Sequence, residues 1–246
     1  MHDRYRHLVI VATLALLSGC FNAPHSGNGN TNSSAKTGPT YGSGDVTANK
    51  GGGHTVNGSV RVPDGEKTGD LSSVNGSIQV GDNVTLLSAR TVNGNITLGS
   101  HDTADSLTTV NGSILLEDGT RIAHAVHAVN GALTLRSGAD VGGALTNVNG
   151  TIHLNAARVG GGIMTANGDV LIKGGSHVEG GILVQKPPSG WFQFTHEPQI
   201  VIGPGSVVTG DLRFDRKVDL YVSDKAKIGR VIGATPQRYA GEGPIG

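Results

Sequence analysis

The side chains in this sequence that could perform catalytic or metal chemistry are a handful of histidines and carboxylates. Cleavage of a glycosidic bond needs two carboxyl groups on either side of it, and a zinc site needs three or four ligands. Asp169 is the one acid among the polar positions that directly follow a repeated Asn-Gly pair. The histidines of the regular part of the chain are scattered, at His101, His124, His127, His153 and His177. We therefore expect a protein that is not an enzyme, with no catalytic residue, metal or cofactor.

The Asn-Gly pair itself is the dominant repeat of the chain. Its successive steps are 18, 18, 18, 19, 19 and 18 residues, and its asparagines are Asn57, Asn75, Asn93, Asn111, Asn130, Asn149 and Asn167. Asn-Gly between apolar stretches is typical of a two-residue hairpin. However, the next turn cluster, at residues 81–83, follows too closely to give paired strands of equal length. A fixed period of this length indicates a repeat architecture instead.

Aliphatic residues recur every six positions within each repeat. They are Val74, Val80, Leu86, Val92, Leu98, Ala104, Val110, Leu116 and Ile122. A second set stands two positions earlier, as Ile78 does before Val80, and a spacing of two places both side chains on one face of a short strand. Three strands and three corners then make one repeat. The pattern predicts an all-β fold, a single-stranded parallel β-helix with triangular coils of 18 or 19 residues, in which Val74, Val92 and Val110 lie above one another in the core.

The Asn-Gly pair is then one corner of every coil. Asn and Gly tolerate the left-handed backbone conformation that a sharp corner can require. Stacked at about 4.8 Å, the asparagine amides can also hydrogen-bond along the column. We expect a structural asparagine ladder, with a ligand-binding ladder as the alternative.

The N-terminus has the features of an export signal. Arg4 and Arg6 precede an apolar run at residues 8–19, which is too short to span a bilayer. The stretch from Leu17 to Cys20 resembles the lipobox of bacterial lipoproteins, which implies that residues 1–19 are removed and that Cys20 is lipidated. Phe21, rather than Asp, follows the cysteine, and the resemblance implies the outer membrane of a Gram-negative cell envelope. Residues 20–53 are rich in Gly, Ser and Asn and predict a flexible tether.

Two further segments complete the predicted organisation. The β-helix is expected at residues 54–234, with an inserted loop at 185–199 and a C-terminal tail at 235–246. The loop concentrates Trp191, Phe192 and Phe194 in a chain that is only 4% aromatic. These side chains either shield an apolar edge of the helix or contact a partner or glycan.

The repeated "VNGSI" and "VNGNI" coils resemble the β-helical repeats of head-GIN-type bacterial adhesins. The segments "IGPGSVVTGDLRF" and "AKIGRVIGA" are similar to bactofilin, a polymer-forming cytoskeletal family. Both resemblances imply a right-handed helix, which the 19-residue coils also favour, although a sixfold phase is shared with the left-handed hexapeptide helix. Bactofilins lack the lipobox and tether seen here.

These features predict a lipid-anchored cell-envelope β-helix with a structural or adhesin-like role. Its partners would be the membrane, through Cys20, and a glycan or protein ligand. A self-assembling scaffold that stacks end to end is the first alternative, and a polysaccharide-active enzyme is the second. The formal net charge of zero, with no basic stripe interleaved with aromatics, argues against nucleic acid as a partner.

Overall fold

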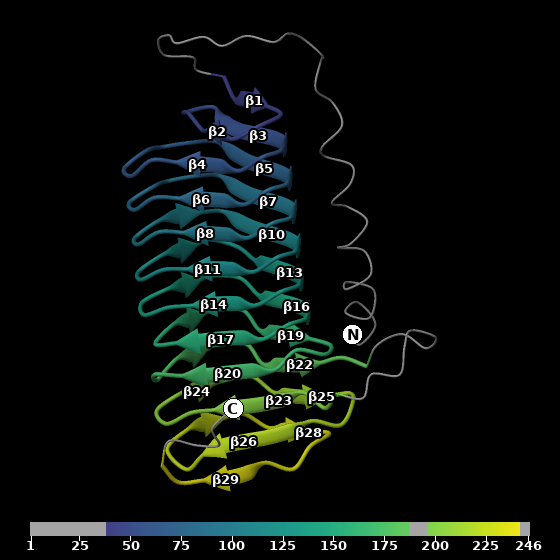
Figure 1. Cartoon of the computed structure of the whole chain (residues 1–246). Helices are drawn as coiled ribbons and strands as arrows, with labels where there is room; N and C mark the ends of the chain where they lie inside the picture. Colours follow the sequence, from purple (N-terminus) through teal and green to yellow (C-terminus); the bar gives the residue numbers. More distant parts are fainter. Residues whose placement is uncertain (1–37, 187–195, 242–246) are drawn as a thin grey trace, which may run out of the picture. The chain divides into compact units, whose positions relative to one another are not determined.

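The structure, a computed structural model, describes residues 38–186 and 196–241 (Figure 1). These residues contain strands and turns and no α-helix, so no segment among them has the form of a membrane-spanning helix. The strands stack in parallel into three sheets, and the chain visits the sheets in turn as it climbs. The predicted parallel β-helix is confirmed.

The first sheet holds eleven strands. In spatial order they are β1 (Thr40–Gly42), β3 (Gly52–Asn57), β5 (Asp70–Asn75), β7 (Ser88–Asn93), β10 (Ser106–Asn111), β13 (Val126–Asn130), β16 (Leu145–Asn149), β19 (Ile163–Thr165), β22 (Ile182–Val184), β25 (Leu212–Phe214) and β28 (Val231–Ile232).

The second sheet also holds eleven strands, and each of them follows a strand of the first sheet after a corner or loop. They are β2 (Val46–Thr47), β4 (Val60–Val62), β6 (Ile78–Val80), β8 (Ile96–Leu98), β11 (Ile114–Leu116), β14 (Leu133–Leu135), β17 (Ile152–Asn155), β20 (Val170–Lys173), β23 (Gln199–Ile202), β26 (Asp219–Ser223) and β29 (Gln237–Tyr239).

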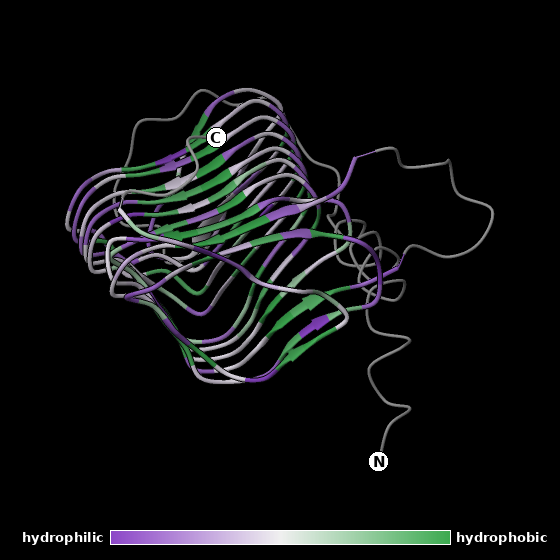
Figure 2. Ribbon diagram, turned by 90° about the horizontal axis from the view of Figure 1, so that it is seen from below, coloured by the Kyte–Doolittle hydropathy of each residue, from purple (hydrophilic) through white to green (hydrophobic). Residues whose placement is uncertain are grey.

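The third sheet is shorter, with seven two-residue strands. They are β9 (Thr103–Ala104), β12 (Arg121–Ile122), β15 (Asp140–Val141), β18 (Arg158–Val159), β21 (His177–Val178), β24 (Val207–Val208) and β27 (Lys227–Ile228). Seen from below, the coils superpose around a common interior (Figure 2).

The core is a stack of aliphatic side chains from all three sheets. Most of the predicted sixfold positions are buried, with Val80, Leu98 and Leu116 in the second sheet and Ala104 and Ile122 in the third. The residues two positions earlier in the second sheet, such as Ile96 and Ile114, are also buried and pair in register. The six-residue period therefore identified two of the three walls.

The wall formed by the first sheet differs from the prediction. Val74 and Val92 are stacked in register, because Ser73 pairs with Thr91 and Asn75 with Asn93, but both valines face outward and are only half-buried. The buried position belongs to the preceding hydroxyl residue, which is Ser73, Thr91 or Thr109 in successive coils. The prediction that the valines line the core is wrong, because alternation within the strand allows either neighbour to face inward.

The β-helix also extends past both predicted ends. It begins at β1, inside the segment assigned to the tether, because β1 pairs with β3 and Val46 is buried beside β4. It ends with β29, in the segment assigned to the tail, where residues 237–239 pair with β26. Cys20, the signal peptide and most of the tether lie outside the described residues.

The inserted loop stands between β22 and β23, where the earlier coils carry the Asn-Gly corner. Trp191, Phe192 and Phe194 lie outside the described residues, so the two alternatives for them stay predictions.

Candidate functional site

The asparagine ladder is present along the corner between the first and second sheets. The side-chain Nδ2 of each asparagine donates to the Oδ1 of the asparagine one coil earlier, over distances of 2.8 to 2.9 Å. The column comprises Asn57, Asn75, Asn93, Asn111, Asn130, Asn149 and Asn167. Each bond takes up one donor and one acceptor of neighbouring amides, so the ladder has the geometry expected of a structural element.

The ladder is closed by an arginine that the sequence did not single out. The loop leaves the next coil without an asparagine, and Arg216 from the coil after it donates through Nη1 to Asn167 Oδ1. The same Nη1 donates to the carbonyl oxygen of Ala166 at 3.0 Å, and Nη2 donates to that of His196 at 2.8 Å. Arg216 thus holds the end of the ladder and the base of the loop together.

The glycine of each Asn-Gly pair is required by the close approach of the coils. A Cβ on Gly94 would lie 2.1 Å from the carbonyl oxygen of Gly76, and a Cβ on Gly112 would lie 1.9 Å from that of Gly94. The ladder asparagines have no positive φ, contrary to the expectation of a left-handed residue there. Among the described non-glycine residues, positive φ occurs at Asn83, His101 and Ala156, which precede the third sheet. Stacking requires the glycine in every coil, and Gly58, Gly131 and Gly150 also have positive φ values of 152°, 142° and 150° that favour glycine.

A second polar column lies inside the same corner. The hydroxyls of Ser73, Thr91 and Thr109 donate to the carbonyl oxygens of Gly58, Gly76 and Gly94 over 2.9 to 3.1 Å. Asn147 Nδ2 takes the same role farther along the column, at 2.8 Å from the Gly131 oxygen. The intervening coil has Ala128 at this position and so supplies no side-chain donor to Gly112. The column satisfies buried carbonyl groups, which explains why polar residues stand in the core.

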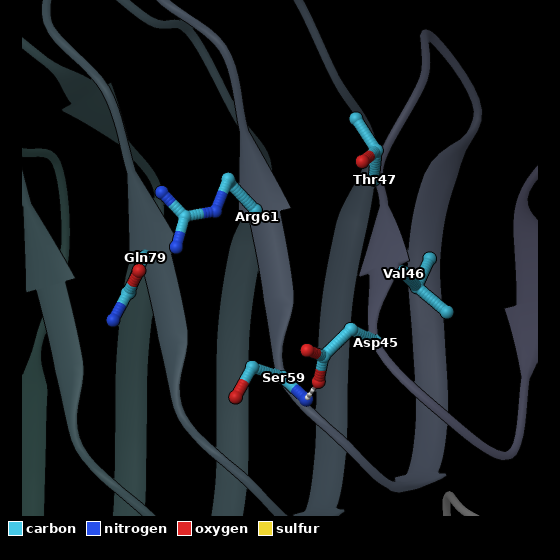
Figure 3. Close-up of a pocket in the computed structure, with 6 residues that line it drawn as sticks. All are labelled: Asp45, Val46, Thr47, Ser59, Arg61 and Gln79. Atoms are coloured by element: carbon cyan, nitrogen blue, oxygen red, sulfur yellow. Dashed lines mark hydrogen bonds between the residues drawn. The ribbon is translucent and has the colours of Figure 1, made fainter.

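The outer face of the second sheet is the polar wall expected from the sequence. A small hollow of about 150 Å³ lies at its first coils (Figure 3). Its polar lining consists of Asp45, Thr47, Ser59, Arg61 and Gln79. Asp45 Oδ1 accepts a hydrogen bond from the backbone N–H of Ser59 at 2.7 Å, so one side of the hollow is fixed. Its size suits one small polar group.

Asp169, the acid noted on this wall, is engaged by the base of the inserted loop. Its Oδ1 lies 2.9 Å from His196 Nε2 and accepts from the backbone N–H of Gln199 at 2.8 Å. Glu117 pairs with Arg136 of the next coil at 3.1 Å in a partly exposed ion pair. Asp169 and Glu117 are therefore both engaged in contacts within the protein.

A larger hollow, of about 430 Å³, opens beside the third sheet across β12, β15, β18 and β21. Arg121, Asp140, Arg158 and His177 stand around it, and glycine and alanine residues line the rest. No feature of the sequence indicated this hollow, because its walls come from four different coils.

The titratable groups with altered pKa values are dispersed. Burial lowers the pKa of His54, His127 and His153, with Asp70 opposing the effect at His54 and Lys173 adding to it at His153. Burial raises the pKa of Asp102 to about 6, against the opposing effect of hydrogen bonds from the Val84 and Gly99 backbone. In the described part of the chain, no three His, Cys, Asp or Glu residues gather as a metal-binding group.

The fold and these surfaces define a β-solenoid of stacked parallel strands with an asparagine ladder along one corner and a second polar column inside it. It is compatible with bactofilin-like β-helical repeats. Comparison with protein-family models, curated proteins and solved structures finds no match for this chain.

Proposed function

We propose that this protein is a lipid-anchored β-helix of the cell envelope with a structural or adhesin-like role. The observation that carries the proposal is the register of the first two sheets, which runs without a break in pairing from β1 to the last coil. Such a body is stiff and repeats its outward side chains at intervals of about 4.8 Å, which suits a spacer or an extended binding surface.

The anchor is proposed from the residues before the β-helix. Acyl chains on Cys20 contribute about 0.8 kcal/mol per buried methylene, so two or three chains hold the protein in a membrane without help from its folded surface. The roughly twenty residues between Cys20 and β1 span on the order of 25 Å as a flexible tether and allow the body to stand clear of the headgroups.

Replacing Cys20 by Ala tests the anchor. The wild-type chain should incorporate labelled palmitate and sediment with the outer membrane, whereas Cys20→Ala should do neither. Replacing Phe21 by Asp is the matched control, because it retains the acylation site and alters only the expected sorting. Release of the wild-type chain into the soluble fraction without detergent would overturn the anchor.

The side of the membrane on which the body works is tested on intact cells. An antibody raised against the folded body should label intact cells if the role is adhesive. Labelling only after the outer membrane is permeabilised would leave the structural role and remove the adhesive one.

A self-assembling scaffold is the second candidate. Among the described residues, the terminal strands β1 and β29 each pair on one side only within their sheets, so both ends of the described stack offer strand edges to another chain. Sedimentation velocity over a hundredfold concentration range is the test. Filaments or a rising sedimentation coefficient would favour the scaffold, and a single species of monomer mass would eliminate it.

A further inference from the structure

The hollow beside the third sheet lies where the corner of successive coils carries only small residues. Gly138, Ala156 and Gly175 line the hollow and have φ values of 73°, 52° and 71°. Residues with a Cβ rarely adopt this conformation, which favours the two glycines, and Ala156 adds only a methyl group. The adjoining strands of the third sheet carry longer side chains, which leaves a recess of about 430 Å³ over the corner. This lies within the range of volumes common for ligand sites.

The rim of the hollow offers hydrogen-bonding groups at one-coil intervals. Arg121, Asp140, Arg158 and His177 are consecutive partners in the register of the third sheet. The Arg158 guanidinium is already engaged within the protein, because it donates to Asp140 Oδ1 at 2.7 Å and to Glu179 Oε1 at 2.5 Å. Within residues 38–186 and 196–241, the Arg121 guanidinium makes no hydrogen bond or ion pair, and Asp140 Oδ2 accepts none.

The charges around the hollow balance. Arg158 pairs with Asp140, which lines the hollow, and with Glu179, which lies just outside its lining. Arg121 is the second positive charge, so these four groups sum to zero and favour neither an anion nor a cation. A free donor beside a free acceptor matches a hydroxyl group, which both donates and accepts. Neighbouring hydroxyls of a sugar ring present such pairs.

We propose that this hollow binds an uncharged oligosaccharide, with the Arg121 guanidinium donating to a sugar hydroxyl and the free oxygen of Asp140 accepting from its neighbour. The proposal rests on the adhesin-like form of the proposed function and names its ligand class. The open recess runs across four coils, so it suits a segment of a longer glycan lying along the stack.

Calorimetric titration of the full-length protein in detergent tests the proposal. The probes are cellotetraose and maltotetraose, which are uncharged, and tetragalacturonate, which is acidic. At least one uncharged tetrasaccharide should bind, and Arg121→Ala should weaken it about tenfold, the effect of losing one hydrogen bond from a charged donor. Analysis of the sugars after incubation should recover them intact, since cleavage would indicate the enzyme alternative.

Two matched variants control for loss of a positive charge. Arg90→Ala removes an exposed arginine from the first sheet, and Arg61→Ala removes one from the smaller hollow of the second sheet. Both should bind the sugar as wild type does, and all three variants should melt within a degree of it. Equal weakening by all three, preference for tetragalacturonate, or binding of neither uncharged sugar would overturn the proposal.

Adherence of whole cells to a glycan-coated surface distinguishes failure of the proposed sugar site from failure of the proposed adhesive role. If cells carrying Arg121→Ala adhere as well as wild type, and cells carrying Cys20→Ala do not, the adhesive role stands and the assignment of this hollow fails. If wild-type cells do not adhere and the body is not exposed, the adhesive role itself fails.

Discussion

Arg216 donates a hydrogen bond to the side-chain oxygen of Asn167, 49 residues earlier in the chain, and so takes the place of the asparagine that the inserted loop displaces. Without Arg216, a partly buried amide oxygen at the end of the ladder would lose its donor. The same guanidinium binds the carbonyls of Ala166 and His196, so one side chain joins three segments.

Replacing Arg216 by Ala should lower the free energy of unfolding by about 1 to 3 kcal/mol, because hydrogen bonds from a charged donor are lost and their acceptors are left unpaired. Urea unfolding followed by circular dichroism measures the change. Arg230→Ala is the control, since its pair with Asp211 is exposed and should contribute well under 1 kcal/mol. Equal effects of the two substitutions would contradict a special role for Arg216.

Replacing Gly94 by Ala should destabilise the protein by about 2 to 3 kcal/mol, since the added Cβ would meet the Gly76 oxygen at 2.1 Å and push neighbouring coils apart. Gly65→Ala separates this steric effect from backbone strain. Gly65 has a φ of 72° but open space around the added Cβ, so its cost should be about 1 kcal/mol. Thermal melting of the two variants measures both losses of stability. A larger loss for Gly65→Ala than for Gly94→Ala would refute the stacking explanation.

Replacing Ala128 by Ser should stabilise the protein by about 0.5 to 1.5 kcal/mol, because it supplies the missing hydroxyl for the Gly112 carbonyl. The opposite change, Thr91→Val, removes the donor to Gly76 while keeping the shape, and should destabilise by about 1 to 3 kcal/mol. Chemical unfolding measures both. A loss of stability in Ala128→Ser would mean that the interior column does not accommodate the hydroxyl.

Asp102 should make stability depend on pH. Its carboxyl group is fully buried, with Oδ1 accepting from the Val84 N–H at 2.7 Å and Oδ2 without a partner among the described residues. Burial raises its pKa from 3.8 to about 6, so the folded state holds the proton more tightly than the unfolded state. Its contribution is therefore most favourable below pH 3.8, falls by up to about 3 kcal/mol as the pH rises to about 6, and is constant above that.

The variant Asp102→Asn keeps the oxygen that accepts from Val84 and cannot ionise. It should be more stable than wild type at pH 7, and the difference should shrink as the pH falls from 6 to 4. The difference between the two curves is the quantity to measure, because His54, His127 and His153 have lowered pKa values and raise stability with pH in both proteins. A difference that stays constant over this range would show that Asp102 is not protonated in the folded state at low pH.

The sequence alone determined the architecture and much of the core of this protein. Each coil repeats one strand-and-corner pattern, so the period of the Asn-Gly pairs and the sixfold spacing of residues such as Leu98 and Leu116 report directly on stacking. The asparagine ladder follows from the same period, because residues one repeat apart are neighbours in space. Local pattern and long-range contact coincide in a solenoid.

Only the tertiary structure shows the features that depend on a group in another coil. Thr91 rather than Val92 faces inward, where its hydroxyl donates to the carbonyl oxygen of Gly76 in the preceding coil. The alternation of side chains within one strand does not show which of these two neighbours faces the core. Gly94 is needed because Gly76 lies against it, and Arg216 reaches Asn167 only because the loop removes the intervening corner. A hydrogen-bond acceptor or a steric limit supplied by another coil has no local signature in the chain, and it becomes visible only when the coils are stacked.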